Sequence, residues 1–164
     1  MSFPFKVGFG YDVHALERGR KLFLGGINIP SEFGLKGHSD ADVLLHALCD
    51  ALLGAAALGD IGKHFPDTDN SFKDIDSKLL LQQVKTVLDK NGYSVGNADM
   101  TLVLQKPKIA PYIEQMTEVI AGILEIDKSC ISIKATTAEK LGFVGREEGS
   151  EAFAIAILYK KENS

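Results

Sequence analysis

Residues 5–14 alternate strictly between two kinds of position, so that the segment looks like a buried β-strand. Side chains at i and i+2 point to the same face of a strand, and we therefore predict a strand over residues 6–13 with two different faces. One face is apolar, and the other carries two glycines followed by an acid and an imidazole: Phe5, Val7, Phe9, Tyr11 and Val13, against Gly8, Gly10, Asp12 and His14. The glycines would let a neighbouring segment or a ligand approach closely.

A helical repeat follows between residues 39 and 55. Its apolar stripe consists of Val43, Leu44, Ala47, Leu48, Ala51, Leu52 and Ala55. Ser39 is the expected N-cap, with Asp40 and Asp42 favourably placed in the first turn. Asp42, His46 and Cys49 fall opposite the stripe, so we interpret His46 as available for chemistry rather than as an ordinary core residue.

Turn residues separate the remaining predicted elements. Gly25-Gly26, between two short apolar runs, predicts a β-hairpin over residues 21–30. A second helix is predicted over residues 77–90, and further elements are a strand over 98–105, a helix over 109–124 and strands over 129–137 and 151–161. The last strand is apolar on both faces and is expected at the centre of the sheet. This order predicts a single α+β domain over residues 1–164, with helices on one face of a mixed β-sheet.

Composition narrows the class of partner and the compartment. The chain has 164 residues, 18 Lys and Arg against 22 Asp and Glu, and a formal net charge of −4 at pH 7, so we expect no nucleic-acid partner. Cys49 and Cys130 lie far apart in the sequence, which favours a reducing compartment over a disulfide framework. Neither a signal-peptide pattern nor an apolar run of membrane length is visible, and we expect a cytoplasmic protein with no membrane partner.

Asp12, His14 and His46 form the first candidate site. Three nitrogen and oxygen ligands with a fourth position left open are typical of a catalytic zinc. The alternative is that Asp12 caps a turn while hydrogen bonds satisfy both imidazoles. Asp42 lies one helical turn before His46, and we expect it to orient that imidazole.

Two polar loops are candidates for substrate binding. His38 and Ser39 at a helix start would suit a phosphate, although a plain serine N-cap also explains Ser39. The loop over residues 59–69 could bind sugar hydroxyls or a metal, or be a solvated turn in which aspartates cap the backbone. We assign no role to His64 within this loop.

Two further segments carry open alternatives. Residues 105–111 could line a nucleotide-base pocket or form a proline-containing turn into a helix. Thr136 and Glu139 have the spacing of a capping box. They could instead lie where threonine hydroxyls hold a diphosphate and Glu139 binds a magnesium ion on its oxygens.

These motifs occur together, in order, in one known family. The stretches are GYDVH, HSDADVLLHALCDALLGAAALGDIGKHFPDTD, QKPK and KATTAEKLGFVGREEG, and they span nearly the whole chain. On these residues the chain resembles the 2-C-methyl-D-erythritol 2,4-cyclodiphosphate synthases of the non-mevalonate isoprenoid pathway. Ala41 and Ala138 depart from the pattern, since a glycine and a polar residue are more usual there, but neither is a candidate metal ligand.

The resemblance implies a role for each matching residue. Asp12, His14 and His46 would hold zinc, Glu139 would reach a magnesium or manganese ion on the substrate diphosphate, and His38 and Thr137 would stabilise the transition state. The implied substrate contacts include Asp12, His14 and Ser39. Those at the methylerythritol end are Asp60, Ile61, Gly62, Phe65, Pro66, Asp67, Thr68 and Asp69, and those toward cytosine are Leu104, Gln105, Lys106, Pro107, Lys108, Ile109 and Ala110. Thr136, Thr137, Ala138 and Glu139 would hold the diphosphate, and Phe143 and Arg146 would complete the pocket. The family is a homotrimer with its sites between subunits, and its substrate is a cytidine diphosphate ester.

The implied reaction agrees with the residues that the chain contains. The 2-phosphate of the substrate attacks the β-phosphorus and releases CMP, and this nucleophile already carries nearly two negative charges near neutral pH. It needs positioning and charge neutralisation more than a base. Two other classes remain open at this point, a zinc phosphodiesterase or pyrophosphatase and a metal-stabilised binding module.

Overall fold

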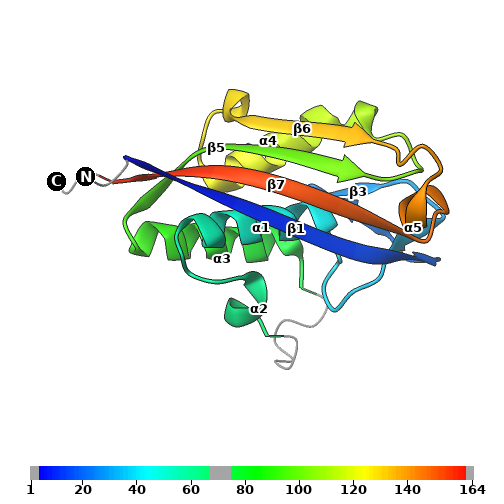
Figure 1. Cartoon of the computed structure of the whole chain (residues 1–164), viewed down its shortest axis with the longest axis horizontal. Helices are drawn as coiled ribbons and strands as arrows, with labels where there is room; N and C mark the ends of the chain where they lie inside the picture. Colours follow the sequence, from blue (N-terminus) through cyan, green and yellow to red (C-terminus); the bar gives the residue numbers. More distant parts are fainter. Residues whose placement is uncertain (1–3, 67–74, 162–164) are drawn as a thin grey trace.

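The computed structural model describes residues 4–66 and 75–161, which form an α+β domain around one mixed sheet (Figure 1). The sheet has five strands in the order β4-β1-β7-β5-β6. Neighbouring strands run antiparallel except β5 and β6, which are parallel. The strands are β1 (Phe5–Arg18), β4 (Phe33–Leu35), β5 (Tyr93–Val103), β6 (Ile131–Thr136) and β7 (Gly149–Lys160). The last strand lies at the centre, as its two apolar faces predict.

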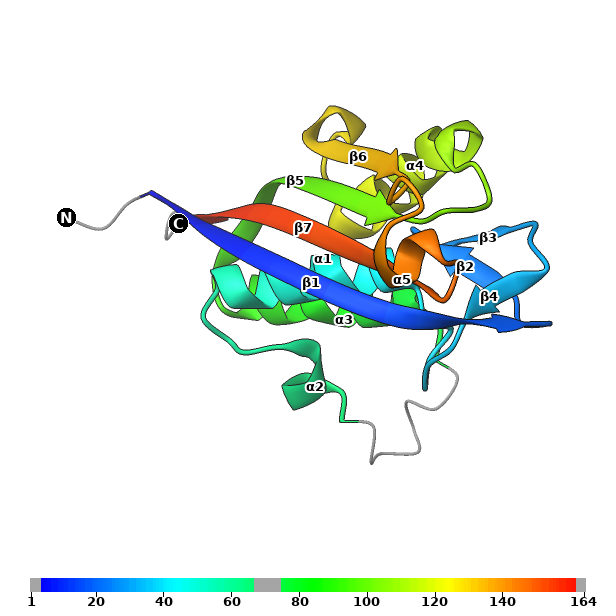
Figure 2. The same ribbon diagram turned by 45° about the vertical axis from the view of Figure 1, so that its right-hand side comes forward.

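Three longer helices cover one face of this sheet (Figures 1 and 2). They are α1 (Val43–Ala55), α3 (Ser77–Lys90) and α4 (Ile113–Leu124). The predicted hairpin is confirmed as the pair β2 (Leu22–Leu24) and β3 (Ile27–Ile29). Two short helices, α2 (Ile61–His64) and α5 (Gly142–Gly145), lie in the loops, and 3-10 turns cover Ala110–Tyr112 and Lys128–Cys130. Within the described ranges, no helix is long and apolar enough to cross a membrane.

Helix α1 packs directly on the glycine face of β1. A Cβ atom added at Gly8 would lie 1.9 Å from the carbonyl oxygen of Ala51, and one added at Gly10 would lie 1.9 Å from that of Ala47. Side chains are therefore excluded at both positions, and the segment that the glycines admit is this helix. Because α2, α3 and β2 contact its other sides, α1 is buried over most of its surface, and Cys49 is fully buried rather than on a spare face.

The apolar face of β1 is the exposed one in the single chain, which corrects the prediction of a buried strand. Val7 and Phe9 are 57% and 62% exposed, and Ile155 on the neighbouring β7 is 47% exposed. Small residues thus face the helix layer, and the large apolar side chains face away from it. This leaves an apolar surface on the outer face of the sheet.

The start of α1 also differs from the prediction. Ser39 is not the N-cap, because the helix begins at Val43 and Asp42 caps it by accepting a hydrogen bond from the amide of Leu45 at 3.0 Å. Ala41 adopts a positive φ of 57°, which breaks any helix that would start at Ser39. Ser39 and Asp40 therefore lie in the loop that leads into α1.

Candidate metal centre and substrate cleft

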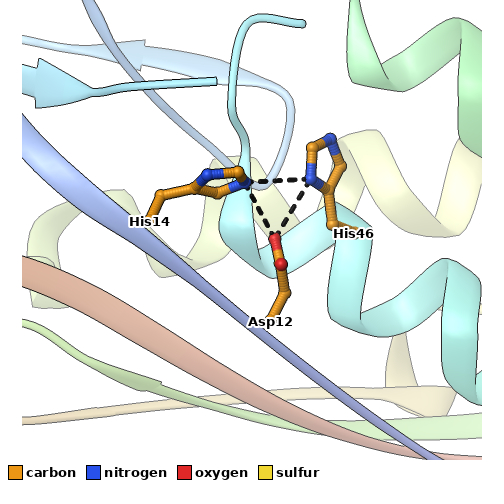
Figure 3. A group of neighbouring side chains, drawn as sticks. All are labelled: Asp12, His14 and His46. Atoms are coloured by element: carbon orange, nitrogen blue, oxygen red, sulfur yellow. Dashed lines mark hydrogen bonds and ion pairs between the residues drawn. The ribbon is translucent and has the colours of Figure 1, made fainter. Parts of the chain in front are cut away.

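The three predicted ligands meet at one point between β1 and α1 (Figure 3). Asp12 and His14 project from the glycine face of β1, and His46 projects from the first half of α1. Asp12 Oδ2 lies 3.0 Å from His14 Nε2 and 3.1 Å from His46 Nδ1, and the two imidazole nitrogens are 3.2 Å apart. Asp12 caps no turn, since it lies within a strand and its carboxylate faces both imidazoles.

This triangle has the dimensions of a metal site. Ligands at about 2.0–2.1 Å from a tetrahedral zinc lie about 3.4 Å from one another, close to the separations observed here. One carboxylate and two imidazoles suit zinc or a similar divalent ion. Among the described residues, Asp12, His14 and His46 form a group of side chains that could hold a metal ion.

The electrostatics of the triangle favour a cation. Burial opposes the charge of Asp12, but hydrogen bonds from His14 and His46 outweigh it and lower the pKa of Asp12 to about 2. Burial by itself would lower the pKa of His46, yet the Asp12 carboxylate raises it above the ordinary value. A proton on His46 and a divalent cation compete for the same carboxylate, so metal binding would release protons.

Asp42 does not orient His46, which corrects the prediction. Its carboxylate oxygens accept hydrogen bonds from the backbone amides of Gly25 and Gly26 at 3.0 and 2.7 Å, besides that of Leu45. Asp42 thereby fastens the β2–β3 turn to the start of α1. It is fully buried, and burial raises its pKa to about 6.

Two serines hold the far side of the His46 ring instead. His46 Nε2 lies 3.1 Å from Ser39 Oγ and 3.0 Å from Ser77 Oγ. Sequence reasoning missed Ser77, because nothing in its spacing connects the first residue of α3 with a histidine in α1. A polar residue at a helix start was the available signal, and it is too common to be informative.

A cleft of about 280 Å³ opens beside the metal ligands. It is lined by Asp12, His14, Gly37, His38, Ser39, His46, Ile61, Gly62, Phe65, Ile75 and Leu80. The structure thus brings the predicted phosphate-binding pair, His38 and Ser39, together with part of the predicted methylerythritol loop. Asp67, Thr68 and Asp69 of that loop lie outside the described residues.

The loop beside this cleft is held by capping interactions. Asp60 caps α2 by accepting from the amide of Lys63 at 2.9 Å, as the solvated-turn alternative anticipates. Asp50 of α1 accepts from the amide of Ile61 at 2.8 Å and so ties the loop to the helix that carries His46. His64 bonds to the carbonyl oxygen of Leu58 at 3.0 Å, away from the metal ligands.

A second cavity of about 290 Å³ collects most of the predicted cytosine segment. Its lining is Leu104, Gln105, Pro107, Lys108, Ile109, Ala110, Ile113, Ala135, Thr136 and Thr137. Lys106 lies outside this lining, with its ammonium group 2.9 Å from Glu147. The predicted site residues of one chain therefore lie in two different cavities, with His38 at the first cavity and Thr137 at the second.

The structure of the segment after β6 contradicts the predicted capping box of Thr136 and Glu139. The helix that follows, α5, begins after Leu141 without a side-chain cap, and the Thr136 hydroxyl bonds instead to the carbonyl oxygen of Thr137 at 3.2 Å. Thr137 donates to the carboxylate of Glu139 at 3.0 Å and accepts from its amide at 3.3 Å.

Phe143 and Arg146 lie farther along the same connection. Phe143 is half-buried, and its ring would lie 3.2 Å from a Cβ atom added at Gly149. Arg146 forms a two-point ion pair with Glu148, both contacts being 3.0 Å. Both side chains thus lie close to the start of β7, in the connection that follows Thr137 and Glu139 along the chain.

Comparison with known proteins shows the family to which the chain belongs. The model of the YgbB family matches residues 5–159. The chain belongs to the YgbB family. The 2-C-methyl-D-erythritol 2,4-cyclodiphosphate synthase of Chloroherpeton thalassium is 60% identical over 94% of the chain and 99% of its own length, and that of a Geobacillus species is 59% identical over 96% and 99%.

Solved structures extend the comparison from the sequence to the fold. The bifunctional IspDF of Campylobacter jejuni superimposes with a TM-score of 0.94 at 43% identity, over 98% of this chain and 44% of that protein. The CDP complex of IspF from Plasmodium falciparum gives a TM-score of 0.84 at 33% identity, over 98% of this chain and all of that one.

Proposed function

We propose that this YgbB-family chain converts 4-diphosphocytidyl-2-C-methyl-D-erythritol 2-phosphate into 2-C-methyl-D-erythritol 2,4-cyclodiphosphate and CMP, as a phosphorus–oxygen lyase of the non-mevalonate isoprenoid pathway. The single observation that carries this proposal is the triangle of Asp12, His14 and His46 opening on a cleft, in a chain whose relatives bear the synthase name. The family match over residues 5–159 supports one synthase domain over residues 1–164.

Two metal sites follow from the donor groups. Asp12, His14 and His46 would hold one zinc ion per chain, and Glu139 would bind magnesium or manganese together with the substrate diphosphate, which needs only one or two protein carboxylates. When bound, these ions supply Lewis-acid polarisation and neutralise charge on the phosphates.

The chain's own residues position the substrate. His38 is exposed at the cleft and can donate a hydrogen bond to a phosphate oxygen, as can the hydroxyl of Thr137 at the second cavity. The first cavity would take the methylerythritol end and the second the cytosine. Because the attacking phosphate is already ionised, holding both ends of one molecule in a reactive arrangement makes ring closure intramolecular.

The two cavities and the exposed sheet face together support a homotrimer with sites between subunits. His38 and Thr137 line different cavities within one chain, so a site that uses both is completed when a neighbour contributes the second cavity. The exposed apolar side chains around Phe9 and Ile155 form a surface of the kind that subunits bury against one another.

Incubation with the cytidylyl substrate and a divalent cation tests the proposal. We expect CMP and the cyclic diphosphate in equal amounts, whereas a zinc phosphodiesterase would release linear hydrolysis products. His46→Ala should remain folded and lose nearly all turnover, and His64→Ala, at a histidine outside the metal triangle, should keep it. Linear products from the unaltered chain would refute the cyclase, and a His46→Ala variant that mainly loses thermal stability would favour the binding module.

A further inference from the structure

His46 is held on the side away from the metal ligands by a buried polar chain. Its Nε2 atom faces Ser77 Oγ at 3.0 Å, and Ser77 is fully buried at the first residue of α3. The carboxylate of Asp40 accepts two hydrogen bonds from Ser77. One oxygen accepts from the Ser77 hydroxyl in a short hydrogen bond, and the other accepts from the Ser77 amide at 3.0 Å.

The chain of donors and acceptors has only one direction. A carboxylate can only accept, so the single hydroxyl proton of Ser77 points to Asp40. The lone pairs of Ser77 Oγ are then left to face His46, and this contact requires a proton on Nε2. Ser39 Oγ lies 3.1 Å from the same nitrogen and accepts from the Ala41 amide, and it can accept from Nε2 as well, so its position is compatible with that proton. A neutral imidazole has one N–H, so Nδ1 then keeps its lone pair. The hydrogen bond from Nδ1 to Asp12, over 3.1 Å, therefore exists only while His46 is protonated, and a divalent cation would take the place of that proton.

We propose that Asp40 and Ser77 are positioning residues that hold His46 in the Nε2–H tautomer and so prepare its Nδ1 for the divalent cation. This inference rests on the proposed function, since it assumes that the triangle binds a metal. Partners of this kind fix the orientation and tautomer of ligating histidines elsewhere. Asp40 also fastens the start of α3 to the site, because its amide donates to the carbonyl oxygen of Ile75 at 3.1 Å.

The first measurement is made on the unaltered protein, and a variant serves only to assign the resonances. Nitrogen-15 NMR of the metal-free protein at about pH 9, well above the ordinary pKa of an imidazole, reports which nitrogen of His46 carries the proton. The His46 resonances are assigned by their loss in His46→Gln. We expect a protonated Nε2 and an unprotonated Nδ1, and the opposite tautomer would overturn the proposal.

Two variants then test the series of hydrogen bonds that runs from Asp40 through Ser77 to His46. Ser77→Ala removes the acceptor, and Asp40→Asn replaces one acceptor oxygen with an NH2 donor of nearly the same shape. Both should give a mixture of His46 tautomers and lower the affinity for zinc by 10–100-fold, measured by competition with a chelating indicator. Asp76→Asn is the matched control, because Asp76 caps the same helix end by accepting from the Lys78 amide at 2.8 Å. It should change neither measurement.

The outcomes separate this proposal from the proposed function. Unaltered protein that binds no divalent cation refutes the metal site, and with it the role assigned to the two residues. Protein that binds zinc and turns over equally well in all three variants, with one His46 tautomer throughout, refutes the positioning role alone. If Ser77→Ala and Asp40→Asn fail to fold, the tautomer of the unaltered protein still decides.

Discussion

Replacing Gly10 with alanine tests how closely α1 presses on β1. The added Cβ would lie 1.9 Å from the Ala47 carbonyl oxygen and 2.7 Å from the Ala51 amide, both backbone atoms of a buried helix. A carbon and an oxygen atom rarely approach closer than about 3.3 Å, so α1 must retreat by about 1.4 Å. Overpacking that forces a backbone shift costs about 3 kcal/mol at its upper end, or about 6–12 °C in melting temperature for a chain of this size.

The same displacement acts on the metal triangle. Gly10 precedes Asp12 by two residues on β1, and Ala47 follows His46 on α1, so a retreat of the helix widens the 3.1 Å gap between Asp12 and His46. Metal sites tolerate deviations of only about 0.2 Å in ligand distance. We therefore expect a loss of zinc affinity in addition to the loss of stability.

Thermal and urea unfolding of metal-free protein at one fixed concentration measures the first effect, and zinc competition the second. Gly54→Ala is the control, because Gly54 is exposed in α1 and its added Cβ would meet nothing closer than 3.9 Å. That substitution should stabilise the helix by about 0.5–1 kcal/mol. If Gly10→Ala unfolded within about 1 kcal/mol of the unaltered chain, less than the cost of overpacking, the described contact between α1 and β1 would be wrong.

Three further outcomes follow from single contacts. Burial raises the pKa of Asp42 from 3.8 to about 6, so ionisation of this carboxyl lowers the stability of the folded chain as the pH rises through that range. Between pH 5 and 7 the free energy of unfolding of the unaltered chain should fall by about 1 kcal/mol more than that of Asp42→Asn. Equal decreases in the two proteins would contradict this. Asp50→Ala frees the amide of Ile61 and should raise KM about tenfold with zinc affinity unchanged, whereas Asp50→Asn keeps an acceptor and should rescue it. Phe9→Asp places a charge on the exposed sheet face and should reduce the mass measured by light scattering to that of one chain, while Lys160→Asp at the end of β7 should not.

Periodicity predicted the parts of the fold that a local pattern determines. Alternation along β1 placed Asp12 and His14 on one face, and the helical repeat of residues 77–90 matched α3 at both ends. The apolar character of residues 151–161 placed β7 at the centre of the sheet. In each case the side-chain period is imposed by backbone geometry and needs no knowledge of the neighbours.

The periodicity of the sequence was insufficient where the structure of a position depends on contacts with residues distant in the sequence. Alternation cannot say which face of β1 the helices cover, and the glycines, whose missing side chains admit α1, were the better guide than the large apolar residues. Ser39 looked like an N-cap, but the positive φ of Ala41 moves the helix start to Val43. Asp42 was assigned to His46 from helical spacing, although the β2–β3 turn, distant in sequence, takes its carboxylate.

The residues that would hold the metal and those that would hold the substrate sit on different kinds of support. Asp12 and His14 belong to a strand paired with β7 from Phe5↔Tyr159 to Ala15↔Gly149, so a slip by one residue would replace both ligands with Tyr11 and Val13 and break the whole ladder. Ile61 and Gly62, in contrast, lie in a four-residue helix. The described hydrogen bonds of this helix include those to Asp50, to its cap Asp60 and from His64 to Leu58. A cation would require fixed distances, and a long flexible substrate would require loops that can adjust. The fold would thus place two of the three ligands on a long paired strand and leave the adjustment to the connections around the cleft.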